Sequence, residues 1–155
     1  GTGATTVKFS DVTIEDSTSG GTGGCFEVVS SIIECVRCTV TEIKVASTNL
    51  DYGGAFVIDG QSKVTIVDSK MTNITGGMLG GFFGCSGCTL DVSGSHFERA
   101  SAEMMGAFIA ATGTAQIDVR NSVVRDVGKL GTDWSSHNIM MINGPTARVS
   151  GVRFE

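Results

Sequence analysis

The cysteines are the residues whose types and spacing come closest to a chemical motif. Cys35 and Cys38 form one Cys-x-x-Cys pair, Cys85 and Cys88 form a second, and Cys25 lies outside both pairs, so that we expect it to be a free thiol. Two such pairs have the ligand spacing of a four-thiolate zinc site, in which every sulfur lies about 2.3 Å from one metal ion. Alternatively, each pair packs at a bend of the core or closes as a disulfide in an oxidising compartment. The second interpretation is favoured, because the pairs fall about two coils apart in the repeat described below.

Acidic residues offer a second kind of chemistry. Asp91 and Asp118 occupy equivalent outward positions of neighbouring repeats, and paired carboxylates serve glycoside hydrolysis or calcium binding. The same column also holds basic and neutral residues, namely Lys8, Lys44, Thr65 and Arg148. A mixed column is typical of a solvated surface, so no catalytic residue is predicted and the chain is not expected to be an enzyme.

Two further features suggest contacts with other molecules. Residues 126–138 form the longest departure from the repeat and contain Asp133, Trp134 and His137, which we single out as a candidate contact with a partner or a glycan. The alternative is that Trp134 folds back and covers the core. Asn73 begins an Asn-Ile-Thr sequon, which predicts N-glycosylation if a eukaryote secretes the protein.

Composition limits the function classes. The chain has 155 residues, 22 of them Gly and one Pro, with only 17% charged residues and a formal charge of −5. The negative charge argues against nucleic-acid binding, and no apolar run is long enough to insert into a membrane. No cofactor is implied by any motif.

The elements that must position these residues follow from an internal repeat. Six segments share an alternation of apolar and polar residues followed by a bend and a large apolar residue: 7–14, 43–50, 64–71, 90–97, 117–124 and 147–154. The bend position reads Asp, Ser, Asp, Gly, Asn and Gly, residues that tolerate a left-handed backbone. The large apolar position reads Ile14, Leu50, Met71, Phe97, Val124 and Phe154.

A second ladder lies between these segments. Phe26, Phe56, Phe82 and Phe108 follow Gly-containing stretches at intervals of 30, 26 and 26 residues. Strand alternation with this period predicts an all-β, single-stranded parallel β-helix of five to six coils, each of roughly 26–30 residues. We expect one domain over 1–155, with the register least certain near residues 32–41, which look like an insertion.

The short motifs of this repeat resemble those of polymorphic outer-membrane-protein-type β-helices. The resemblance rests on Ser69 to Ile74 with Gly76-Gly77, on Ser95-His96-Phe97 with Gly106-Ala107-Phe108, and on 49–56. It implies a right-handed parallel β-helix that is part of a larger surface or secreted protein with an adhesive or structural role, and it implies no catalytic residue.

These observations predict a structural or adhesive protein of the cell surface or extracellular space. A solenoid leaves unpaired strand edges at both ends, so we expect self-association or end-to-end contact with neighbouring β-helix segments, in the limit as a filament. The chain starts without Met and stops within a strand-like pattern, which suggests a segment of a longer solenoid. The alternative is a module that binds or degrades polysaccharide.

Overall fold

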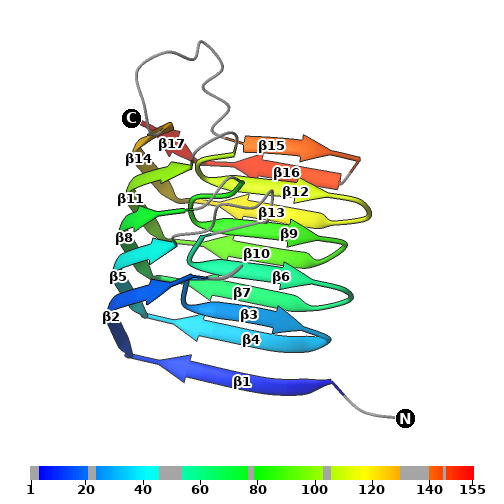
Figure 1. Ribbon diagram of the computed structural model, residues 1–155. Coiled ribbons are helices and arrows are strands. Elements are labelled where there is room, and N and C mark those ends of the chain that lie inside the picture. The colour runs from blue at the N-terminus through cyan, green and yellow to red at the C-terminus, as the bar shows by residue number, and fades with distance from the viewer. Residues whose placement is uncertain are drawn as a thin grey trace.

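The computed structural model describes residues 4–20, 24–45, 54–76, 79–102, 106–129, 140–144 and 146–155. All strands in these ranges pair in parallel, and they form three sheets that run side by side along one column (Figure 1). This confirms the prediction of an all-β parallel solenoid. Within the same ranges no helix is long and apolar enough to span a membrane.

Among the described residues, the sheets that we call A and B contain six strands each, and sheet C contains five. Sheet A consists of β1 (Thr5–Ser10), β4 (Ser31–Val36), β7 (Lys63–Val67), β10 (Thr89–Ser93), β13 (Gln116–Arg120) and β16 (Thr146–Ser150). Sheet B consists of β2 (Thr13–Ser19), β5 (Thr39–Val45), β8 (Lys70–Thr75), β11 (His96–Ala102), β14 (Val123–Lys129) and β17 (Arg153–Phe154). Sheet C consists of β3 (Phe26–Val29), β6 (Phe56–Asp59), β9 (Phe83–Ser86), β12 (Ile109–Thr112) and β15 (Met140–Asn143).

The corner between sheets A and B is made by one left-handed residue in every coil. These residues have φ between 48° and 62°, and they are Asp11, Arg37, Asp68, Gly94, Asn121 and Gly151. Five of them match the bend expected from the sequence. The second does not, because Arg37 makes this bend and Ser47 lies outside the described residues.

The supposed insertion near residues 32–41 is therefore an ordinary coil. Ile33 pairs with Val7 and Val64 in sheet A, and Val40 takes the place predicted for Leu50 between Ile14 and Met71 in sheet B. The sequence prediction was wrong here because arginine rarely adopts a left-handed backbone. Arg37 forms a two-point ion pair with Asp11, the bend residue below it, with Nε 2.6 Å from Oδ1. This pair holds the unusual bend in place.

Aromatic residues fill the middle of the column. Phe56, Phe83 and Phe97 are fully buried, and the ring centroids of Phe83 lie 5.6 Å from Phe56 and 5.7 Å from Phe97. From the third coil onward, the strands of sheet C are one residue out of register with the predicted phenylalanine ladder. Phe56 pairs with Phe83 and not with Phe82. Phe82 and Phe108 precede the strands of sheet C and are also fully buried. Consecutive phenylalanines at 82 and 83 made both registers compatible with the pattern.

Serine side chains join the interior coils at the start of sheet B. The amide of Ser69 donates to Oγ of Ser95 at 3.1 Å, and the amide of Ser95 donates to Oγ of Ser122 at 3.2 Å. Each hydroxyl also donates to a carbonyl of its own coil, for example Ser95 to Ser93 at 2.8 Å. The small residue expected after each bend thus satisfies buried backbone groups of the neighbouring coil.

The corner between sheets B and C requires close contact between backbones. A Cβ added to Gly81 would lie 2.0 Å from the carbonyl oxygen of Ala107 in the next coil, and one added to Gly54 would lie 2.5 Å from that of Gly80. These glycines are therefore needed for the close approach of successive coils.

Candidate functional site

The predicted mixed column around Asp91 and Asp118 lies on the outer face of sheet A, but Lys44 does not belong to it: Lys44 lies in sheet B, and Glu34 stands between Lys8 and Thr65. Asp91 and Asp118 face each other on β10 and β13, and Arg148 on β16 follows Asp118. Lys63 Nζ lies 3.0 Å from Asp91, and Arg120 Nε lies 3.5 Å from Oδ1 of Asp118, a buried oxygen that accepts no hydrogen bond. Each carboxylate thus has a cationic neighbour, as expected for a mixed, partly exposed surface.

Sheet B carries a second column of left-handed residues that the sequence analysis missed. They lie in the middle of its strands with φ between 49° and 57°, and they are Asp16, Glu42, Asn73, Arg99 and Asp126. Each lies five residues after the sheet A–B bend of its own coil, so both columns repeat at the same intervals of 26, 31, 26 and 27 residues. A polar residue five positions after each bend is the signal that the sequence carries, and it becomes a regular series only once Arg37 is known to make the second bend.

This column forms an open hollow of polar side chains. Asn73 is its centre, because its amide nitrogen donates to Glu42 and its amide oxygen accepts from Arg99 Nε. Lys44 and Asp126 also line the hollow, whose volume is about 440 Å³. Asn73 glycosylation stays a prediction, and the nitrogen that would carry the glycan is the one that donates to Glu42.

A charged group lies next to the hollow on β11, an interior strand of sheet B. His96 Nε2 lies 3.3 Å from Glu98, and Arg99 forms an ion pair with the same carboxylate. The pKa of Glu98 is lowered, mainly because His96 hydrogen-bonds to it and also because Arg99 and Arg125 lie nearby. Since this carboxylate is ionised and paired at neutral pH, it lacks the raised pKa expected of a general acid.

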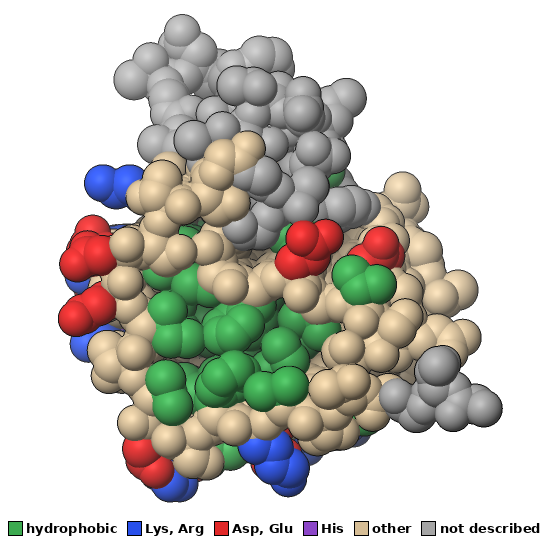
Figure 2. Space-filling model, turned by 60° about the horizontal axis from the view of Figure 1, so that its bottom comes forward, with side chains coloured by type: hydrophobic (Ala, Val, Ile, Leu, Met, Phe, Trp, Pro, Cys, Tyr) green, Lys and Arg blue, Asp and Glu red, His purple; other side chains and the backbone are tan. Residues whose placement is uncertain are grey.

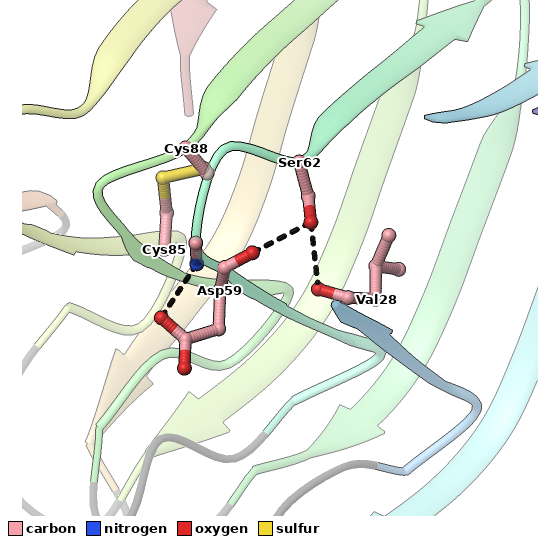
Figure 3. The surroundings of a disulfide bond; sticks show 6 residues. Val28, Asp59, Ser62, Cys85 and Cys88 are labelled. Carbon is pink, nitrogen blue, oxygen red and sulfur yellow. Dashed lines mark hydrogen bonds between the residues drawn. A yellow bond between two sulfur atoms is a disulfide. The ribbon is translucent and has the colours of Figure 1, made fainter. Parts of the chain in front are cut away.

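The two Cys-x-x-Cys pairs lie at different corners of the column. Cys35 and Cys38 flank the bend between β4 and β5, whereas Cys85 and Cys88 flank the bend between β9 and β10. Cys85 and Cys88 form a disulfide, and Figure 3 shows it at the bend beside Ser62. Cys25, Cys35 and Cys38 are free. In the described ranges no three His, Cys, Asp or Glu side chains are arranged to hold a metal ion, and the four cysteines of the alternative zinc interpretation are not brought together.

The ends of the column differ from its faces. Figure 2 turns the N-terminal end forward and shows hydrophobic side chains gathered at its centre, with charged side chains around the rim. In the part of the chain that the structure describes, the large hydrophobic residues that are exposed all lie in the first or last coil: Val7 (39%), Val29 (54%), Val149 (42%) and Phe154 (43%). Val7, Val149 and Phe154 stand in inward columns, whose members in the interior coils, such as Val64, Val92 and Phe97, are buried. Val29 is different, because it stands in the outward column of Asp59 in sheet C.

The predicted contact residues Asp133, Trp134 and His137 lie outside the described residues. Their role in binding a partner or a glycan stays a prediction.

No protein-family model, curated protein or solved structure matches this chain. The parallel β-solenoid is therefore the level at which the chain is classified, and the functional argument rests on its own residues.

Proposed function

We propose that the protein is a structural β-solenoid that associates end to end with a second copy of itself. The observation that carries this proposal is the location of the exposed hydrophobic residues in the terminal coils. Burying side chains of this size contributes roughly 1.5–3 kcal/mol each when burial is complete, and these residues are already part-buried. Several partial contributions of this kind favour a weak, concentration-dependent association.

Both ends present the same pattern in the same register. In sheet A, Ala147 and Val149 of β16 occupy the columns of Val7 and Phe9 of β1. In sheet B, Phe154 occupies the column of Ile14. A second copy placed on the C-terminal end would therefore add β1 to β16 and β2 to β17 with apolar residues facing inward. Sheet C has one strand fewer, so the proposed junction uses sheets A and B.

The outward charges weaken this junction. The register places Glu155 beside Glu15 of the second copy, and Arg148 beside Lys8. Like charges directly opposite on neighbouring strands are destabilising by a few tenths of a kcal/mol, and salt screens them. Association should therefore increase as the salt concentration rises.

Two charge variants on the same strand test the junction. Glu15→Lys would place a cation beside Glu155 of the second copy, and its own neighbour in β5 is the uncharged Thr41. Thr13→Lys adds the same side chain two residues away, where it would face Arg153 of the second copy and has Thr39 as its own neighbour. Sedimentation equilibrium at low salt should show tighter association for Glu15→Lys and weaker association for Thr13→Lys.

The association constant of the wild-type chain should lie between those of the two variants. If both variants sediment as the wild type does, or if the wild type remains a monomer at every concentration and salt level, the end-to-end proposal is wrong. Circular dichroism of each variant checks that the fold is retained.

The cell surface or extracellular space is the proposed location, and adhesion is the proposed wider role. The Cys85–Cys88 disulfide supports an oxidising compartment. Kinship with the polymorphic outer-membrane-protein-type repeats stays part of this proposal. Secretion of the full-length protein, followed by surface labelling of intact cells, is the direct test, and an exclusively cytosolic signal would contradict it.

A carbohydrate-binding or polysaccharide-degrading module is the second candidate. The hollow around Asn73 favours binding, because it offers an amide, a guanidinium and carboxylates at one place. A glycan array should then give a signal that Arg99→Ala reduces at least tenfold. A signal unaffected by Arg99→Ala but lost with Trp134→Ala would assign binding to Trp134 and its sequence neighbours, and no signal would remove this candidate.

A further inference from the structure

The two Cys-x-x-Cys corners share one backbone form. In each, the first cysteine is the second-last residue of a strand, as Cys35 is in β4 and Cys85 is in β9. The third residue is left-handed in both, with φ 53° at Arg37 and 64° at Gly87. The second cysteine immediately precedes the next strand.

The side chains also have the same surroundings. All four cysteines point into the core, with exposures of 0% and 1% for Cys35 and Cys38 and of 0% and 2% for Cys85 and Cys88. The bend amides donate to the following coil in both corners, from Arg37 to Val67 at 2.9 Å and from Gly87 to Thr112 at 3.2 Å. Cys85 and Cys88 are bonded, with Cα atoms 5.7 Å apart.

Cys35 and Cys38 are already in side-chain contact. The thiol of Cys35 interacts with that of Cys38, and this contact adds to burial in raising the pKa of Cys35. Cys38 Sγ also lies 3.8 Å from the carbonyl oxygen of Phe9 in the first coil. Because the two corners share their backbone form, Cys35 and Cys38 have the arrangement in which Cys85 and Cys88 are bonded.

We propose that Cys35 and Cys38 form a second disulfide, of the same local form as Cys85–Cys88, by exchange with a small-molecule disulfide. One thiolate attacks the small disulfide and releases one of its thiols, and the second cysteine then displaces the other. The two cysteines lose two electrons and two protons in total, and the small disulfide becomes two thiols. Cys25 is the one thiol that remains.

Exchange in the folded protein is slow, since the thiolate is the reactive form. Burial raises the pKa of Cys25 to about 11 and raises that of Cys35 further. Oxidation is therefore faster during folding, or when the first coils open. This inference does not depend on end-to-end association.

The test is to refold the full chain in mixtures of reduced and oxidised glutathione and to alkylate the remaining thiols under denaturing conditions. Mass spectrometry should show one alkylated thiol per chain, at Cys25, instead of the three that are free in the structure. Trypsin cleaves after Arg37, so the proposed bond would join the peptides 9–37 and 38–44 until a reductant is added.

Because peptide 9–37 also contains Cys25, two variants identify the partner of Cys38. The joined peptides should persist in Cys25→Ser and disappear in Cys35→Ser. The proposal is overturned if Cys35 and Cys38 are both alkylated in a mixture that fully oxidises Cys85–Cys88, or if the joined peptides disappear in Cys25→Ser. Failure of both pairs to close in the most oxidising mixture also overturns it.

Discussion

The interior coils and the first coil have the same strand order but different surroundings. Phe97 in β11 is fully buried and contacts three other phenylalanine rings, whereas Phe9 in β1 contacts only Phe26 among the described rings. Ser95 exchanges hydrogen bonds with the coils on both sides, and the equivalent position of the first coil is Val12. In a solenoid each coil contacts only its neighbours, so a coil that lacks one neighbour loses about half of its contacts.

Removing a buried ring should produce the largest difference between the two regions. Phe97→Ala is expected to lower the free energy of unfolding by roughly 3–5 kcal/mol, because it leaves a cavity among Phe82, Phe83 and Phe108. Phe9→Ala, in the half-buried first coil, should lower it by roughly 1–2 kcal/mol. Urea denaturation measures both, and equal losses would contradict the contrast between interior and end.

A methyl group added to the backbone sharpens the comparison. Gly81→Ala places a Cβ against the carbonyl of Ala107. It should lower the free energy of unfolding by roughly 1–3 kcal/mol, as other substitutions that overpack a core do. Gly20→Ala follows β2 in the first coil, where nothing lies within 4 Å, and should change stability by less than about 0.5 kcal/mol. Thermal unfolding of both variants tests this expectation. An unchanged melting temperature for Gly81→Ala would contradict the close approach of Gly81 to the carbonyl of Ala107.

The serine ladder gives a smaller effect. Ser95→Ala removes the acceptor of the buried Ser69 amide. It is expected to lower the free energy of unfolding by about 1–2 kcal/mol. Ser31→Ala is the matched control, since its exposed hydroxyl donates to Val29 of the preceding strand and joins no neighbouring coil among the described residues. If the two variants unfold at the same urea concentration, the ladder does not stabilise the interior coils.

The smallest effect concerns the bend of the first coil. Arg37 holds the pKa of Asp11 below its ordinary value, mainly by hydrogen bonding. A carboxyl whose pKa is depressed by folding stabilises the protein above its unfolded-state pKa, and this stabilisation is lost as the pH falls through the folded-state pKa. Asp11→Asn should therefore be slightly less stable than the wild type at neutral pH.

The difference between Asp11→Asn and the wild type should shrink as the pH falls below 3.8, the ordinary pKa of this group. High salt should also reduce it, because the pair is exposed. A difference that stays constant from pH 7 to pH 2 would show that the ion pair is not its cause.

The fold was predictable because its signal is repeated in every coil. Inward apolar residues and left-handed bend residues recur at 11, 68, 94, 121 and 151, and a single irregular coil does not hide such a series. The second coil was placed wrongly because Arg37 is not a usual bend residue, and its partner Asp11 is 26 positions away in the sequence. The conformational propensity of a residue and its sequence neighbours carries no information about an ion pair between coils.

The candidate sites were less predictable for a related reason. The Cys85–Cys88 bond agrees with one of the two interpretations of the cysteine spacing, and the column containing Asp91 and Asp118 was recognised as mixed. The hollow around Asn73 was missed because it depends on bends in the middle of strands, where the alternation of apolar and polar residues gives no warning. The exposed residues at the ends look in sequence like those of any other coil.

Hydrogen exchange at increasing protein concentration tests the central claim most directly, because it compares the ends with the interior in one experiment. At low concentration, the amides of β1 and β16 should exchange faster than those of β7, β10 and β13 in the same sheet. At high concentration and high salt, protection should rise in β1, β2, β16 and β17 and remain unchanged in the interior strands. Uniform protection at all concentrations, or a gain confined to an outer face such as that of Asn73, would contradict association through the ends.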